Sequence, residues 1–144
     1  MRTILITGAS GGLAQEMVKL LPNDQLILLG RNKEKLGQLY GNHSHTELVE
    51  IDITDDQALE TLVAELYQRY GKIDVLINNA GYGIFEEFDQ ISDKDIHQMF
   101  EINTFALMNL SRCLGARMKE RGKGHIINIV SMAGLIATSK SSLY

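Results

Sequence analysis

The chain has 144 residues with a formal net charge of −4 at pH 7, and 44% of its residues are hydrophobic, which suits a single globular domain, residues 1–144, with a substantial core. The acidic balance gives no electrostatic reason to expect nucleic acid or an anionic membrane as a partner, and no run approaches the roughly 18 apolar residues of a membrane span. The single cysteine, Cys113, excludes an intramolecular disulfide. The apolar stretch after Met1 is too short for a signal peptide, so we expect a cytoplasmic protein.

Apolar, β-branched runs alternate with helical patterns along the chain. The runs predict five strands, at residues 3–7, 25–29, 46–51, 73–78 and 125–130. The helical patterns predict four helices, at residues 13–21, 33–40, 56–70 and 93–121. This alternation is typical of right-handed βαβ units, and therefore of an α/β fold with a parallel sheet covered by helices on both faces. The nearly continuous apolar character of the strands agrees with burial on both faces.

A glycine-rich loop, Thr7-Gly8-Ala9-Ser10-Gly11-Gly12-Leu13-Ala14, joins the first strand to the first helix. Gly8 suits the sharp turn at the end of the strand, and Gly12 lets backbone amides approach a pyrophosphate. The small Ala14 lets the helix lie close to the strand. The position between strand and helix favours a dinucleotide site, with a structural turn that binds no ligand as the alternative.

The end of the second strand predicts which dinucleotide is bound. NAD-binding sites place an acid about 20 residues past the glycine loop, where it holds the ribose 2′-hydroxyl. Here Gly30 fills that place and Arg31 follows it. A small neutral residue followed by a forked cation accommodates a 2′-phosphate. We therefore expect NADP(H) to be preferred over NAD(H), unless Arg31 is only a solvated turn charge.

Three motifs together resemble the short-chain dehydrogenase/reductase family. They are the Gly-x-x-x-Gly-x-Ala spacing from Gly8, the Asn78-Asn79-Ala80-Gly81 run, and Ser131 placed thirteen residues before Tyr144. The resemblance implies a Rossmann-like, doubly wound, three-layer sandwich with strand order 3-2-1-4-5. It implies hydride transfer between a nicotinamide and a small carbonyl or secondary alcohol. A non-catalytic dinucleotide-binding module or sensor is the alternative.

The resemblance also assigns roles to individual residues. Asp52 would contact the adenine amino group, and Asn79 would brace the sheet and line the cofactor site. The full set of cofactor-binding residues that the resemblance implies is Gly8, Ser10, Gly11, Gly12, Leu13, Arg31, Asp52, Ile53, Asn79, Ala80 and Gly81.

Three residues match catalytic positions of the family: Asn103, Ser131 and Tyr144. By resemblance, Tyr144 would give a proton to the substrate carbonyl, Ser131 would hydrogen-bond the carbonyl oxygen, and Asn103 would hold a water in the proton relay. The family's fourth member, a lysine four residues after the tyrosine, does not occur in this sequence. We therefore expect little or no turnover from residues 1–144 alone.

The matched segment corresponds to the cofactor half of a family member, so we expect a domain that is incomplete at its C-terminus. The strand at residues 125–130 would be a bare sheet edge, which invites pairing with further chain or with a partner. Family habit implies a homo-oligomer, either a dimer or a tetramer. His43-Ser44-His45 lies in a short polar turn without further ligands, so we expect a solvated loop there and no metal site.

Overall fold

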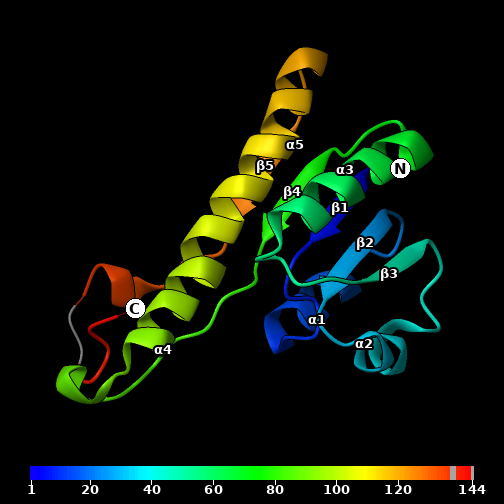
Figure 1. Cartoon of the computed structure of the whole chain (residues 1–144). Helices are drawn as coiled ribbons and strands as arrows, with labels where there is room; N and C mark the ends of the chain where they lie inside the picture. The colour runs from blue at the N-terminus through cyan, green and yellow to red at the C-terminus, as the bar shows by residue number, and fades with distance from the viewer. Residues whose placement is uncertain (137–138, 144) are drawn as a thin grey trace.

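The computed structural model describes residues 1–136 and 139–143. Five strands form one parallel sheet in the order β3-β2-β1-β4-β5. The predicted sheet and its strand order are therefore confirmed (Figure 1). The strands are β1 (Thr3–Ile6), β2 (Gln25–Gly30), β3 (Thr46–Glu50), β4 (Val75–Asn78) and β5 (His125–Asn128).

Helices cover both faces of the sheet and make two separate cores. On one face, alternate strand residues such as Ile4 and Leu28 pack with α1 and α2; on the other, residues such as Leu5 and Ile27 pack with α3 and α5. The arrangement is the three-layer sandwich that the sequence predicts. The helices are α1 (Gly12–Lys19), α2 (Lys33–Tyr40), α3 (Asp56–Tyr70), α4 (Asp93–Phe100) and α5 (Leu107–Arg121), with short 3₁₀ turns η1 (Phe88–Gln90) and η3 (Met132–Gly134).

The helix expected at residues 93–121 differs from the prediction in one respect. The structure has a continuous rod, but its middle part, η2 (Glu101–Ala106), is π-helical and separates α4 from α5. Figure 1 shows α4 and α5 as one long rod beside the sheet. Its start is as expected, because Ser92 caps α4 by accepting the N–H of Asp95 at 3.1 Å. A π-helical turn within an α-helix frequently marks a functional site.

The β5 edge of the sheet is open in the structure. All four residues of β5 are exposed, and Val130, which follows the strand, is 83% exposed. Along the rod, Leu110 and Leu114 are buried against the sheet, while Phe105 and Met108 are exposed. The apolar side chains of the rod therefore lie partly in the core and partly on the surface.

Most described residues of the C-terminal segment are exposed: residues 132, 134–136, 139, 140 and 142. Ser141 is buried, and the Lys140 ammonium lies 3.5 Å from the Glu87 carboxylate beside η1.

Asp74 joins several elements at the amino end of the sheet. One of its carboxylate oxygens accepts the backbone N–H of Thr3 at 2.9 Å and lies 2.9 Å from the Lys72 ammonium. The other oxygen accepts from the Arg121 guanidinium at 3.1 Å. Burial alone would raise the pKa of Asp74, but the bonds from Thr3 and Lys72 outweigh it and hold that pKa below its ordinary value.

This lowered pKa predicts an acid-dependent loss of stability. The contribution of Asp74 is complete above the unfolded carboxyl pKa of about 3.9 and is lost as the pH falls towards the lower folded value. We expect Asp74→Asn to reduce the free energy of unfolding by about 1–3 kcal/mol at pH 7. The deficit should shrink as the pH is lowered to about 3, measured by urea denaturation. Glu60→Gln, at an exposed position on α3, is the control. A loss of stability in Asp74→Asn that does not depend on pH would contradict the lowered pKa of Asp74.

Candidate functional site

A cavity of about 750 Å³ lies where β1, β2, β3 and β4 reach their carboxyl ends. Open α/β sheets bind ligands at this edge, next to the point where the strand order reverses. In this sheet the reversal lies between β1 and β4. The structure brings all eleven predicted cofactor-binding residues together in the cavity lining: Gly8, Ser10, Gly11, Gly12, Leu13, Arg31, Asp52, Ile53, Asn79, Ala80 and Gly81.

The glycine loop owes its shape to a close approach of two backbones. Gly8 has a φ of +62°, and a Cβ added there would lie 2.7 Å from the Cα of Ala80. Only glycine fits such a position without displacement of the chain. Ala9, the next residue, donates its N–H to the Leu29 carbonyl at 2.9 Å and accepts the Tyr40 hydroxyl at 2.6 Å. The loop is therefore held between β2, β4 and α2.

Thr7 and Asn79 fasten the ends of β1 and β4 to each other. The Thr7 hydroxyl oxygen accepts the N–H groups of Asn79 at 3.0 Å and of Ala80 at 2.9 Å. The Asn79 amide nitrogen donates to the carbonyls of Thr7 at 3.1 Å and Gly8 at 3.2 Å. Asn79 thus makes the kind of bracing contacts that the family resemblance implies, and it fixes the position of Gly8.

The start of α1 offers free backbone donors to the cavity. Gly11 is the N-cap residue, and no side chain among the described residues caps the helix. The first N–H groups of an α-helix have no partner within the helix. Those of Gly12 and Leu13, which line the cavity, are therefore available to an anion, which the helix dipole also favours. A Cβ added at Gly12 would meet no atom within 4 Å, so the space above this backbone is open.

A corner of the cavity carries one cation without a protein partner. Within residues 1–136 and 139–143, Arg31 makes no hydrogen bond and no ion pair, and its side chain is exposed at the end of β2. A Cβ at the preceding residue, Gly30, would lie 3.2 Å from the side chain of Leu36, so a larger residue there would require Leu36 to move. This corner can accept an anion, and an acidic residue at position 30 does not fit without rearrangement.

Asp52 lies beside Arg31 and keeps one oxygen for a ligand. Its Oδ1 accepts the N–H of Thr54 at 2.9 Å and the Thr54 hydroxyl at 2.7 Å. These bonds lower the pKa of Asp52, and the nearby Arg31 charge lowers it further. The carboxylate is therefore ionised at neutral pH, with Oδ2 able to accept a hydrogen bond from an amino group.

The predicted catalytic residues are placed less completely than the cofactor residues. Asn103 lies in the π-helical turn, where its Oδ1 accepts the N–H of Tyr82 at 3.0 Å and its Nδ2 donates to the Tyr82 carbonyl at 2.6 Å. Ser131 is half-buried, and its hydroxyl oxygen accepts the N–H of Ala133 at 3.1 Å. Neither residue lines the cavity, and Tyr144 lies outside the described residues.

The sequence interpretation missed part of the cavity lining, which lies on the side of the rod. Asp95, Gln98 and Ile102 line the cavity at successive spacings of three and four residues, which places them on one helical face. That spacing was a usable signal. Tyr82 and Ile84 could have been found by following the chain past Gly81. The remaining missed lining residues are Leu29 and Ile51, and Gly30, which the sequence analysis used to predict the cofactor, also lines the cavity.

Residues 1–136 and 139–143 lack the features of two other classes of site. No group of three or more His, Cys, Asp or Glu side chains there could hold a metal ion. Within the same residues, none of the helices has the length and apolar character needed to cross a lipid bilayer. The ring of His43 packs edge-on against Tyr40, with ring centres 5.8 Å apart.

Comparison with known proteins places this geometry in a family. The model of the family described as short chain dehydrogenase matches residues 2–144. The chain belongs to the short-chain dehydrogenase family. Among curated relatives, the ketoacyl reductase HetN of Nostoc sp. is 34% identical over 149 residues, which covers 99% of this chain and 52% of HetN. The chain thus spans about half the length of the curated relatives it matches first.

Solved structures show the same fold with different dinucleotides. A metagenomic short-chain oxidoreductase in complex with NADP has a TM-score of 0.90 at 26% identity, covering 99% of this chain and 68% of that one. An NAD⁺-bound xylitol dehydrogenase has a TM-score of 0.91 at 26% identity, covering 99% and 58%. Both dinucleotides thus occur on this fold.

Two glycines of the loop should respond in opposite ways to an added methyl group. Gly8→Ala meets the Ala80 backbone at a positive φ, so it should lower the free energy of unfolding by about 2–4 kcal/mol. Gly12→Ala points into open space at the first turn of α1 and should change stability by between zero and a gain of about 1 kcal/mol. Chemical denaturation gives the free energy of unfolding of both variants. Equal destabilisation would contradict the close contact between Gly8 and the Ala80 backbone.

Proposed function

We propose that the protein is an NADP(H)-dependent oxidoreductase that transfers hydride between the nicotinamide and a small carbonyl or secondary alcohol. The observation that supports it most directly is the shared cavity, in which the open amides of α1, the free Arg31 and the ionised Asp52 face one space at the carboxyl edge of the sheet. Family membership supports the reaction class.

The residues of the cavity fit a dinucleotide phosphate. The N–H groups of Gly12 and Leu13 would hold the pyrophosphate, because they are donors without acceptors at a helix N-terminus. Asp52 would accept from the adenine amino group, and Arg31 would hold the 2′-phosphate. When bound, the nicotinamide supplies or accepts the hydride.

The preference for NADP(H) rests on Arg31 and Gly30. The Arg31 guanidinium is exposed and has no partner among residues 1–136 and 139–143, which supports charge-assisted, forked hydrogen bonding to a phosphate. Similar proteins include one with NADP and one with NAD⁺, so family membership alone does not determine the preference.

For catalysis we propose the roles that the family resemblance implies. Tyr144 would exchange a proton with the substrate oxygen, and Ser131 would donate a hydrogen bond to that oxygen. Asn103 would act in the proton relay, and its two bonds to Tyr82 support an additional role in fixing the chain after Gly81.

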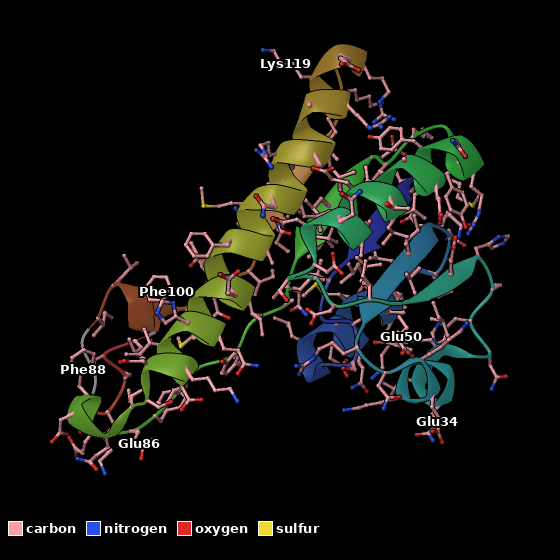
Figure 2. The ribbon with its side chains drawn as sticks, in the orientation of Figure 1. Glu34, Glu50, Glu86, Phe88, Phe100 and Lys119 are labelled. Atoms are coloured by element: carbon pink, nitrogen blue, oxygen red, sulfur yellow. The ribbon has the colours of Figure 1, made fainter. Side chains whose placement is uncertain are left out.

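We further propose a homo-oligomer, a dimer or a tetramer, in the cytoplasm. The rod carries large apolar side chains on its surface, including Phe100, Phe105 and Met108. Phe100, labelled in Figure 2, projects from the rod on the side away from the sheet. Exposed apolar patches of this kind are common at protein interfaces.

Arg31 provides the sharpest test of the cofactor preference. We expect Arg31→Gln to weaken NADPH binding by roughly 10- to 100-fold, the value of a charge-assisted hydrogen bond, and to change NADH binding little. Lys35→Gln removes a nearby cation, on α2, that does not line the cavity and is the matched control. Isothermal titration calorimetry gives the affinity of the wild type and of each variant for both dinucleotides, and a wild-type protein that binds NADH tenfold more tightly than NADPH would overturn the preference.

A polypeptide of residues 1–144 should bind NADPH without appreciable turnover. It contains no lysine four residues past Tyr144, and an unassisted tyrosine is only about 0.1% phenolate at pH 7. Lowering that pKa by three units needs about 4 kcal/mol of charge stabilisation. NADPH oxidation with a panel of ketones and aldehydes should not exceed the rate of the Ser131→Ala variant. Robust reduction by this polypeptide would refute the expectation.

A further inference from the structure

Glu50 is an acidic residue at the end of the strand that pairs with β2, and the sequence interpretation assigned it no role. It ends β3 and pairs in register with Gly30 of β2. The strand ends are fastened there, because Ile51 donates its N–H to the Gly30 carbonyl at 2.9 Å. Because Arg31 directly follows Gly30, Glu50 lies at the strand end from which the chain continues into Arg31.

The Glu50 carboxylate also takes up a backbone donor at the start of α2. Its Oε2 accepts the N–H of Lys33, the first residue of the helix, at 2.8 Å. The Asn32 side chain accepts the N–H of Lys35 at 2.8 Å. Two of the unpaired donors of the helix are thus satisfied by side-chain oxygens, one of them charged.

The position of Glu50 matters only for a ligand that carries an anion at this corner. A 2′-phosphate that binds Arg31 would approach a carboxylate fixed between Gly30 and Lys33. Like charges repel, and salt weakens the repulsion between exposed groups. A ribose 2′-hydroxyl carries no charge and experiences no such repulsion.

We propose that Glu50 is a specificity-determining residue of the dinucleotide site. Its carboxylate repels the 2′-phosphate of NADP(H) and occupies the Lys33 N–H. Glu50 thereby lowers the ratio of NADP(H) affinity to NAD(H) affinity, which Arg31 raises. This inference rests on the proposed function.

The test is Glu50→Gln, with Glu34→Gln as its matched control. Glutamine can still accept the Lys33 N–H, so the start of α2 is preserved while the charge is removed. Glu34 lies in the first turn of α2, next to Lys33. Its carboxylate accepts a hydrogen bond from the Gln38 side-chain amide at 3.5 Å. Figure 2 shows Glu50 beside the start of α2 and Glu34 on the side of the helix that faces away from the sheet.

The measured quantity is the ratio of NADPH to NADH affinity, obtained by calorimetry together with thermal unfolding of each variant. Glu50→Gln should raise the ratio about fivefold at low salt, and the gain should shrink at about 1 M salt. Glu34→Gln should leave the ratio unchanged, and neither variant should shift the melting temperature appreciably. Because a merely structural role of Glu50 would move stability and both affinities together, the ratio isolates specificity.

The failures of the two proposals are distinguishable. If the wild-type protein binds NADPH and NADH but Glu50→Gln leaves their ratio unchanged, or strengthens both equally, the role of Glu50 is overturned and the proposed function stands. An equal effect of Glu34→Gln would overturn the role of Glu50 as well. If the wild-type protein binds neither dinucleotide, the proposed function and this inference both fail.

Discussion

The site depends on the fastening of β1 to β4 where the strand order reverses. The helices that follow β1 and β4 lie on opposite faces of the sheet, so the carboxyl edge between the two strands is open to a ligand. The Thr7 hydroxyl and the Asn79 amide bridge the two strand ends with four hydrogen bonds. They place Gly8 against Ala80 so closely that no side chain fits between them. The glycine loop and the first turn of α1 take their positions from this contact.

The two ends of the sheet differ in how their polar groups are satisfied. At the amino end, Asp24 is bonded to Arg2, and Asp74 is bonded to Thr3, Lys72 and Arg121. At the carboxyl end, Arg31 and the first amides of α1 have no protein acceptor among the described residues. These donors are exposed and gather around the cavity. A helix N-terminus and a guanidinium at one cavity suit an anionic ligand at this end of the sheet.

Much of this architecture could be predicted because it follows from local chemistry. The apolar β-branched runs gave the strands, and the alternation with helices gave the parallel sheet. The glycine loop gave the edge at which the cavity lies. The π-helical turn at η2 could not be predicted, since Glu101–Ala106 has no distinctive residue pattern and the turn depends on how the rod packs. The bonds of Asn103 to Tyr82 follow from that turn, so they were equally inaccessible.

The role of Glu50 was missed for a different reason. Its contact with Lys33 arises from the register of β3 against β2, which a single sequence does not specify. The lining residues Asp95, Gln98 and Ile102 share a helical face, but only the tertiary structure brings that face to the carboxyl edge of the sheet. Local pattern thus predicted which segments form the site, and long-range packing determined which further side chains enter it.

Amide hydrogen exchange with and without NADP⁺ reports on the backbone donors at the start of α1. It therefore tests whether these amides bind the pyrophosphate of the dinucleotide. Saturating NADP⁺ should slow exchange at the amides of Gly12 and Leu13, which have no acceptor among the described residues of the free protein. No change is expected in the loop around His43, on the opposite edge of the sheet. Unchanged exchange at Gly12 and Leu13 in the presence of both NADP⁺ and NAD⁺ would contradict the account.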